Sequence, residues 1–493
     1  MQVLSSSTDA SLTPEQAVDR LEVMHTAACK ALRDALQRYA DSGTPPTAEE
    51  RAAFRYPELR VTWAPLGGKS RPAGRRAWAK FQSPGVYATT VTQPGHFRPY
   101  LLEQLRPLRD EFGAAIEVRN SLQEIPYPYV AEIGDEFLKG DLPVADLARH
   151  FPTPELANVG DEIADGTWHF RDGEPRPLAL FDAARVDFSL KRLAHYTGIP
   201  WSAVQPWILL TNYNRYVDQL VQLGLDDLSQ PKGRYEILVM LGGQIIRRGD
   251  EPAAARVAAG AAPWHRFQMP AYSLTSADGH GVTIINIGVG PSNAKTITDH
   301  LAVLRPNMWL MVGHCGGLRQ TQEIGDYVLA HAYLRRDRIL DDLVPPEIPI
   351  PALAEVQVAL QEAAAQVTGD HGEALKKRLR TGTVVTYDDR NWELRWTQER
   401  QRINLARAVA VDMESGTLAA QGYRFRVPYG TLLAVSDKPL HGEIKLPGAA
   451  TAFYQRSVGQ HLAIGLATID LLRDQLGSLH SRKLRSFDEP VFR

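Results

Sequence analysis

Two carboxylates, Glu414 and Asp437, each directly follow an apolar segment that is typical of a buried strand. A carboxyl group at the mouth of an apolar sheet loses hydration in its charged form, so its pKa rises and it can donate a proton near neutral pH. Two such groups on neighbouring strands could act as an acid and as an anchor for sugar hydroxyls. Each also fits a structural role, because Asp and Glu stabilise the first turn of a helix.

A glycine-rich segment, GVGPSNAK at residues 288–295, follows another strand-like segment. Its glycines let backbone amides approach a ligand, and Gly290 is followed by Ser292 and Asn293, where a helix is expected to begin. The start of a helix presents amide groups that favour an anion or a sugar hydroxyl. A tight turn with a serine cap explains the same residues without a ligand.

A second glycine-rich segment, GHCGGLR at residues 313–319, comes directly after the apolar residues WLMV. Its closely spaced glycines, Gly316 among them, indicate that the backbone comes close to a neighbour or a ligand. Arg319 can bind an anion through two parallel hydrogen bonds, which lysine cannot do. We expect Cys315 to be a packed thiol rather than a nucleophile, because its neighbours are apolar residues and glycines.

The segment TYDDRNWE at residues 386–393 combines aromatic and charged side chains after another strand-like segment. The rings of Tyr387 and Trp392 could stack on a planar base. A helix N-terminus with solvated charges is the other interpretation of this segment.

Strands that alternate with helices must position these groups. From residue 234 onward the pattern predicts a three-layer α/β domain, in which ligands collect at the carboxyl ends of the strands. The strand-like segments are residues 235–240, 282–290, 307–317, 326–334, 380–388, 408–413 and 429–437, and the helical ones are residues 292–304, 353–367, 414–421 and 450–472.

The preceding residues predict a different kind of domain. Thr13 to Gln16 form a capping box with proline at the first helical position, which predicts a long helix. Strand-like segments at residues 86–92 and 115–119 follow, and helical, aromatic segments that include residues 207–224 complete this region. The expected domains are an α+β domain at 1–225, an α/β domain at 226–476 and a polar tail at 477–493.

The composition excludes several classes of protein. The 493 residues contain 55 Lys and Arg against 57 Asp and Glu, so nothing favours binding to nucleic acid or to an anionic membrane. No apolar run approaches the roughly 20 residues that span a bilayer, and the first residues lack the pattern of a signal peptide. The 2 cysteines and the scattered histidines predict neither a disulfide framework nor a protein-built metal site. We expect a cytoplasmic protein without a metal or a tightly bound cofactor.

The order of the segments resembles a known superfamily. GVGPSNA, VGHCGGL, GDYVLAHA, VDMES and LLAVSDKP occur in this order and are similar to the motifs of purine nucleoside phosphorylases and nucleosidases. Longer segments, among them TGTVVTYDDRNWELRW, SDKPLHGEIKLPG and QEIPYPYV, resemble the AMP nucleosidase family over nearly the whole chain. The resemblance implies a nucleoside-phosphorylase-like catalytic domain in an enzyme that hydrolyses AMP to adenine and ribose 5-phosphate.

The same resemblance implies roles for four of the residues. Asp437 corresponds to the residue that protonates or hydrogen-bonds N7 of the purine. Glu414, with Met413 beside it, corresponds to the ribose site, where the carboxylate accepts hydrogen bonds from hydroxyls and favours a cationic sugar. Tyr387 corresponds to an aromatic residue that lies against the base.

A nucleotide substrate also requires a site for its 5′-phosphate. We expect Arg319 and the amides near Ser292 and Asn293 to form it, with Arg266 and Arg335 as the next candidates. In the phosphorylases, similar glycine and arginine motifs hold free phosphate instead.

By resemblance, the amino-terminal domain is regulatory, with ATP as activator and phosphate as inhibitor, and the assembly is a homohexamer. The loop at residues 67–76 clusters lysine and arginine around glycines, which suits a polyphosphate; a solvated basic loop is the other interpretation. Any Mg²⁺ would arrive with ATP.

Two other functions remain open at this stage. In a nucleoside or nucleotide phosphorylase, phosphate would replace water as the nucleophile, and the sequence does not identify a group that activates water. A nucleotide-sensing protein whose catalytic site has decayed is the second alternative. The presence of both Asp437 and Glu414 argues against it.

Overall fold

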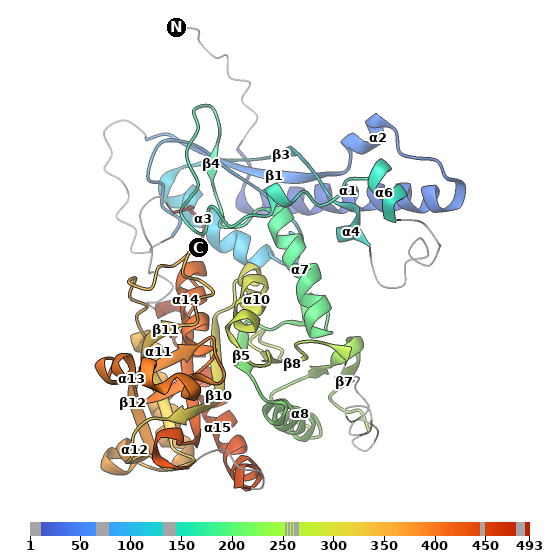
Figure 1. Ribbon diagram of the computed structural model, residues 1–493. Coiled ribbons are helices and arrows are strands. Elements are labelled where there is room, and N and C mark those ends of the chain that lie inside the picture. The colour runs from blue at the N-terminus through green and yellow to red at the C-terminus, as the bar shows by residue number, and fades with distance from the viewer. Residues whose placement is uncertain are drawn as a thin grey trace. The chain divides into compact units, whose positions relative to one another are not determined.

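The computed structural model describes residues 11–65, 78–131, 144–251, 266–443, 449–479 and 489–493, together with Ala254, Val257 and Gly260. Contacts between residues divide the chain into two compact units (Figure 1). Unit 1 comprises residues 1–191 and 483–493, and unit 2 comprises residues 192–482. The boundary falls within helix α7, Ala183–Thr197.

Unit 1 combines helices with a four-stranded sheet in the order β3-β1-β2-β4. Helix α1, Pro14–Ser42, begins at Thr13, whose hydroxyl accepts the Gln16 backbone N–H, while the Gln16 side chain accepts the Thr13 N–H. The predicted capping box and helix are therefore confirmed. The other elements are β1 (Arg55–Trp63), β2 (Gly85–Thr90), β3 (Ala115–Glu124), β4 (Arg176–Pro177), α2 (Ala48–Ala52), α3 (Arg98–Phe112), α4 (Tyr127–Val130), α6 (Val144–His150) and the short 3₁₀ helix η1 (Leu156–Asn158).

The last described residues belong to the core of unit 1 and do not form the polar tail that was expected at 477–493. Val491 and Phe492 are buried in this core. The Phe492 N–H donates to the Leu178 carbonyl at 2.9 Å, and the Ala79 N–H donates to the Val491 carbonyl at 2.7 Å. The prediction was wrong at this end because two apolar side chains close a mostly polar segment, and burial removes them from water.

Unit 2 is built on a ten-stranded sheet in the order β13-β12-β11-β14-β10-β5-β9-β8-β6-β7. β10 also pairs with β13, so the strands from β13 to β10 close on themselves into a small barrel. The strands are β5 (Trp207–Thr211), β6 (Ile237–Val239), β7 (Ile245–Arg247), β8 (Ala271–Thr275), β9 (Val282–Asn286), β10 (Met308–Gly317), β11 (Tyr327–Arg336), β12 (Leu379–Tyr387), β13 (Ala410–Asp412) and β14 (Tyr429–Asp437).

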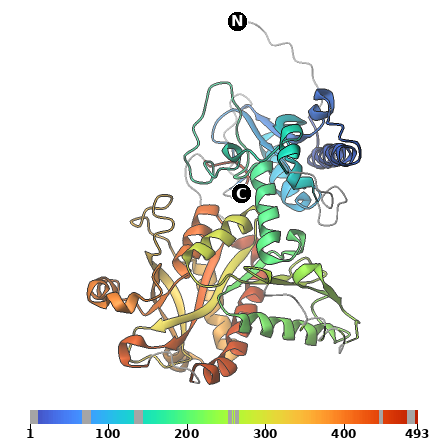
Figure 2. The ribbon, with the colours of Figure 1, turned by 45° about the vertical axis from the view of Figure 1, so that its right-hand side comes forward.

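Helices cover both faces of this sheet, which confirms the predicted three layers (Figure 2). On β10, the Trp309 indole donates to the Leu418 carbonyl of α14 at 3.1 Å, whereas Val312 lies against Gly465 of α15. Alternate side chains of a strand point to opposite faces, so α14 and α15 lie on opposite sides. The helices are α8 (Asn214–Leu228), α10 (Pro291–Leu301), α11 (Ala354–Thr368), α12 (Gly372–Arg378), α13 (Trp396–Leu405), α14 (Ser415–Phe425) and α15 (Ala449–Arg473), with 3₁₀ helices η2 (Trp201–Ala203), η3 (Leu241–Gly243), η5 (Ala302–Leu304), η6 (Trp392–Arg395), η7 (Pro439–His441) and η8 (Leu476–Ser478).

The change between the two units lies at residue 191, earlier than the boundary expected at residue 225. Residues 207–211, expected in a helical segment of the first domain, form β5, which pairs between β10 and β9 in the sheet of unit 2. All residues of β5 are buried. A short apolar run fits a buried strand and a buried helix equally well by periodicity, and this ambiguity misplaced the boundary.

Candidate active site

Two helices begin at the carboxyl ends of strands in unit 2 and carry several of the predicted residues. α10 follows β9 and starts directly after Gly290, whose φ of 114° is readily adopted only by glycine. α14 follows β13 and starts directly after Glu414. The two helices therefore bring two of the predicted segments to the sheet edge where ligands bind.

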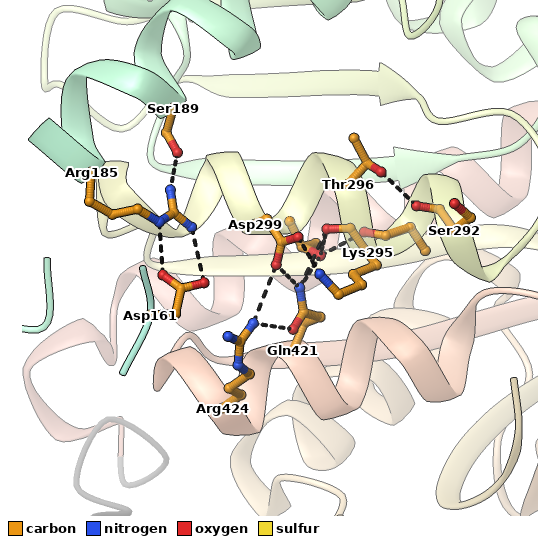
Figure 3. Close-up of polar contacts among 11 residues, drawn as sticks. Asp161, Arg185, Ser189, Ser292, Lys295, Thr296, Asp299, Gln421 and Arg424 are labelled. Carbon is orange, nitrogen blue, oxygen red and sulfur yellow. Dashed lines mark hydrogen bonds and ion pairs between the residues drawn. The ribbon is translucent and has the colours of Figure 1, made fainter. Parts of the chain in front are cut away.

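Asp299 on α10 joins these two helices (Figure 3). Its Oδ1 accepts from the Gln421 amide at 2.6 Å and from the Arg424 guanidinium at 3.4 Å, both on α14. Its Oδ2 pairs with Lys295 at 2.7 Å. Because Arg424 is buried and Asp299 only slightly exposed, water screens this network weakly, and it fixes the distance between the helices.

Glu414 is almost completely buried and both of its carboxylate oxygens accept hydrogen bonds. Oε1 accepts the Gly290 backbone N–H at 2.6 Å, and Oε2 accepts from the Asn212 side-chain amide at 3.1 Å. Asn212 directly follows β5. Three different strand ends thus hold one carboxylate in place, which is what a fixed anchor for a sugar requires.

Asp412, which sequence reasoning missed, stabilises the start of α14. Its Oδ2 accepts the backbone N–H of Ser415 at 2.8 Å and that of Glu414 at 3.3 Å, and its Oδ1 accepts from the Thr386 hydroxyl at 2.7 Å. The signal in the sequence was an Asp two residues before Glu414, where a short acidic side chain can accept the first N–H groups of the following helix. Asp412 thus accepts the amides at the start of α14, and the Glu414 side chain makes no capping hydrogen bond of its own.

Burial raises the pKa of both acids. For Glu414 the lost hydration is the largest cause, the charge of Asp412 adds to it, and the hydrogen bonds from Gly290 and Asn212 oppose it, which leaves a pKa of about 8. Burial likewise raises the pKa of Asp412, against the hydrogen bonds from Ser415 and Thr386. The folded protein therefore retains the proton of Glu414 to a higher pH than the unfolded chain does.

We expect Glu414→Gln to weaken the pH dependence of stability. Below the ordinary pKa of 4.5 the carboxyl group is protonated in both the folded and the unfolded state, and above about 8 it is ionised in both. In the window between them only the folded state keeps the proton, so the free energy of unfolding falls as the pH rises. Thermal melting at about pH 5.5 and about pH 8.5 should show a smaller loss for the variant than for the parent. Equal losses would show that Glu414 does not hold this proton.

Asp437 ends β14, which lies beside β10 in the barrel. Gly316 of β10 pairs in register with Asp437 on one side and with Val411 of β13 on the other. The Ser436 hydroxyl donates to Asp437 Oδ1 at 2.5 Å. The structure thus brings Asp437 to the same edge of the barrel as the strand that leads into Glu414, and Gly316 lies between them.

A cavity of about 560 Å³ opens where α10 begins, a size that suits a small molecule. Three predicted residues line it: Gly290, Ser292 and Met413. The remaining lining residues come mostly from the segments after β11 and β12 and were not predicted; they are Val289, Pro291, Asp337, Arg338, Ile339, Asp388 and Arg390. The cavity therefore joins three of the predicted residues to Arg338 and Arg390, whereas Glu414, Asp437 and Gly316 are not among its lining residues.

The arginines expected at the phosphate are not among the lining residues of this cavity. Arg319 is exposed, and its guanidinium donates to the Arg407 carbonyl at 2.6 Å. Arg335 is buried and donates to the Val344 carbonyl at 2.6 Å and to the Asp341 carboxylate at 3.2 Å. Arg266 is exposed.

Tyr387 and Asn293 also do not line the cavity. Tyr387 is only 4% exposed, its hydroxyl donates to Glu399 at 2.9 Å, and its ring stacks on Trp392 with 5.9 Å between centroids. This packing in a hydrophobic cluster stabilises the segment after β12. Asn293 lies against Gly288, where a Cβ atom would come within 2.9 Å of the Asn293 amide nitrogen.

His314 of β10 belongs to a buried chain of hydrogen bonds. His461 Nε2 lies 3.0 Å from the Leu432 carbonyl, which can only accept, so a neutral His461 accepts at Nδ1 from the Tyr216 hydroxyl at 2.6 Å. Burial lowers the pKa of His461 to about 3, which keeps it neutral. The Tyr216 oxygen then accepts from His314 Nε2 at 3.2 Å. The chain therefore fixes which nitrogen of His314 carries its proton.

Other predictions concern features away from this cavity. The basic loop at residues 67–76 lies outside the described residues. Within the part of the chain that the structure describes, no group of three or more His, Cys, Asp and Glu side chains is arranged to hold a metal ion. In that same part, none of the helices has both the length and the apolar character needed to cross a membrane. Cys315 is buried, as expected of a packed thiol.

Two family models match the sequence. One is described as the amino-terminal part of bacterial AMP nucleoside phosphorylase and matches residues 16–175, and the other is the phosphorylase superfamily and matches residues 250–470. The AMP nucleosidase of Escherichia coli (strain K12) is 55% identical to this chain over 484 residues, which cover 98% of this chain and 99% of that protein.

More distant similarities are confined to part of the chain. A 5′-methylthioadenosine/S-adenosylhomocysteine nucleosidase of Oceanobacillus iheyensis is 25% identical over 165 residues, which cover 32% of this chain and 68% of that protein. Among solved structures, an AMP nucleosidase from Bacteroides thetaiotaomicron is 25% identical, covers 59% of this chain and 98% of its own, and superimposes with a TM-score of 0.42.

Proposed function

This chain belongs to the AMP nucleosidase family, and on that premise we propose that it hydrolyses the N-glycosidic bond of AMP to adenine and ribose 5-phosphate. The observation that carries the proposal is the placement of Glu414. This buried carboxylate is held by the amides of Gly290 and Asn212, and two residues in contact with it, Gly290 and Met413, line a cavity of about 560 Å³. Such a group can recognise ribose hydroxyls and the charge that develops on the sugar.

The leaving base requires a proton as the bond between C1′ and N9 breaks. The electron pair of that bond moves onto the purine, and we assign Asp437 to donate a proton to N7 or to share one with it. The family resemblance supports this role, and the position of Asp437 at the end of β14, beside Gly316, is compatible with it. Adenine then leaves as a neutral base.

The sugar becomes a cation in the transition state and is captured by water. We assign the ionised Glu414 to accept hydrogen bonds from the ribose hydroxyls and to stabilise this positive charge, with Met413 against the ring. Water adds to C1′ and loses a proton. This proton balances the one that the purine gained when it left. The balanced reaction is AMP plus water to adenine plus ribose 5-phosphate.

We also propose that unit 1 regulates the enzyme, with ATP as activator and phosphate as inhibitor, in a cytoplasmic homohexamer. The family model that matches unit 1 is compatible with a separate amino-terminal role. Unit 1 contains a cavity of about 1020 Å³ whose lining includes Arg51, Arg55 and Arg149, and arginine suits the phosphate groups of either effector. Mg²⁺ would bind with ATP and take most of its ligands from phosphate and water.

The proposal is tested by incubating the purified protein with AMP, in the absence and in the presence of orthophosphate. Hydrolysis predicts adenine and ribose 5-phosphate without added phosphate. A nucleotide phosphorylase would release adenine only when phosphate is present and would form a sugar that carries a second phosphate. A decayed nucleotide sensor would bind AMP without releasing adenine in either case. Either of the last two results would contradict the proposed function.

A further inference from the structure

We propose that Arg338 and Arg390, together with the backbone amides at the start of α10, form the subsite that binds the 5′-phosphate of AMP. The inference rests on the proposed function, because it concerns the phosphate end of the same substrate. It assigns a phosphate monoester to one wall of the cavity described above, and it replaces Arg319 as the expected ligand.

The cavity connects this wall to the ribose site. Gly290 and Met413 line the cavity, and both contact Glu414: Gly290 donates its backbone N–H to the carboxylate, and Met413 precedes it in the chain. Arg338 and Arg390 line the same cavity. In a nucleotide the 5′-phosphate is separated from the ribose hydroxyls by only a few bonds, so both ends must fit in one cavity. An anchored ribose therefore leaves its phosphate within reach of this wall.

The start of α10 supplies amide donors to the same space. Pro291 at its first position has no N–H, so Ser292 and Asn293 offer the first unsatisfied amides of the helix. Pro291 and Ser292 line the cavity. Helix N-termini carry partial positive charge, which favours a phosphate group, and the neighbouring arginines add full charges to it.

Arg338 lies two residues after the end of β11 in the left-handed conformation, with a φ of 58°. Its Nε lies 3.6 Å from Asp388 Oδ2, and the two side chains are 55% and 33% exposed. An exposed pair at this distance contributes little to stability, so a phosphate dianion can displace or join it at small cost. Arg390 follows Asp388 by two residues and is itself exposed.

The acidic residues of the lining do not oppose this assignment. Asp337 is buried, accepts a hydrogen bond from the Thr417 hydroxyl and is paired with Arg335 at 3.7 Å. Asp388 is the partner of Arg338. By contrast, Arg319 and Arg335 each donate to a backbone carbonyl of the protein, and neither lines the cavity.

The test compares Arg338→Gln, Arg390→Gln and the double variant with the parent protein, using the ratio of kcat/KM for AMP to kcat/KM for adenosine. We expect each single change to lower this ratio by about 10- to 100-fold and the double change to lower it by on the order of 1000-fold, because adenosine has no phosphate to lose. Arg234→Gln is the matched control: Arg234 pairs with Asp470 and is similarly exposed in unit 2, and its ratio should not change.

Calorimetric titration with AMP and with adenosine separates this inference from the proposed reaction. If the parent binds AMP more tightly than adenosine but does not cleave it, the reaction is wrong, and the loss of that preference in the double variant still supports the subsite. An unchanged ratio in the double variant, or an equal fall for both substrates, overturns the subsite. A fall of the ratio in Arg319→Gln but not in the double variant also overturns it. If the double variant loses only inhibition by orthophosphate, the wall binds free phosphate and the assignment to AMP is wrong.

Discussion

Replacing Asp437 by asparagine is expected to lower kcat for AMP cleavage by about 100-fold or more while leaving AMP affinity nearly unchanged, because removing a general acid usually costs that much. The amide keeps the shape of the side chain and can still donate a hydrogen bond to the base, but it has no readily transferred proton. Rapid measurement of adenine release at saturating AMP gives kcat, and calorimetry gives the affinity.

The matched control is Asp470→Asn, another carboxyl-to-amide change in unit 2, on helix α15. Asp470 pairs with Arg234 and is 46% exposed, so its change should leave kcat within about threefold of the parent. Comparable kcat in Asp437→Asn and the parent would remove Asp437 from the mechanism.

Glu414→Gln is expected to lower kcat by about 100-fold with a much smaller change in KM, because a charge that stabilises the cationic sugar acts mainly in the transition state. Gln preserves the side-chain length and can still accept the Gly290 N–H. Steady-state kinetics with AMP at about pH 8.5, where the parent carboxylate is largely ionised, provides the comparison.

Two further variants show whether the charge of Glu414 or one of its hydrogen bonds causes the loss of kcat. Asn212→Ala removes one hydrogen bond from Glu414 but leaves its charge, so its kcat should fall by only about 10-fold. Glu414→Asp keeps the charge at a shorter reach and should retain more activity than Glu414→Gln. A defect of Glu414→Gln that is confined to KM would show that the carboxylate only binds the ground state.

Sequence patterns were sufficient to locate the edge of the sheet but not every residue that lines the cavity. Gly290, Met413 and Glu414 could be predicted because each stands directly beside a recognisable strand or helix, and such ends meet at one edge of an α/β sheet. Arg338 could not, because nothing local distinguishes it among the 55 basic residues, and Arg390 stands in the segment TYDDRNWE, where only the aromatic rings were given a role. They become neighbours only because β11 and β12 pair in parallel, with Arg336 opposite Tyr387.

Two residues were given roles from their side-chain chemistry that their contacts in the structure do not support, for physical reasons. Arg319 has the chemistry to bind a phosphate, but its long side chain reaches the Arg407 carbonyl instead, and sequence order does not reveal that contact. Tyr387 resembles a base-stacking residue, yet Trp392 covers its ring and Glu399 accepts its hydroxyl proton. Its contact with the purine therefore stays a prediction.

The packing of Val491 and Phe492 into unit 1 has a consequence for synthesis on the ribosome. Domains usually fold in the order in which they emerge, so unit 1 should collapse first. Its core, however, lacks Phe492, and the carbonyl of Leu178 lacks its backbone partner, until all of unit 2 has been translated. The part of the nascent chain that emerges first is thus the last to be completed. A released chain that is truncated after residue 488 should therefore contain a folded unit 2 and a protease-sensitive unit 1, whereas the full chain should be protected in both units.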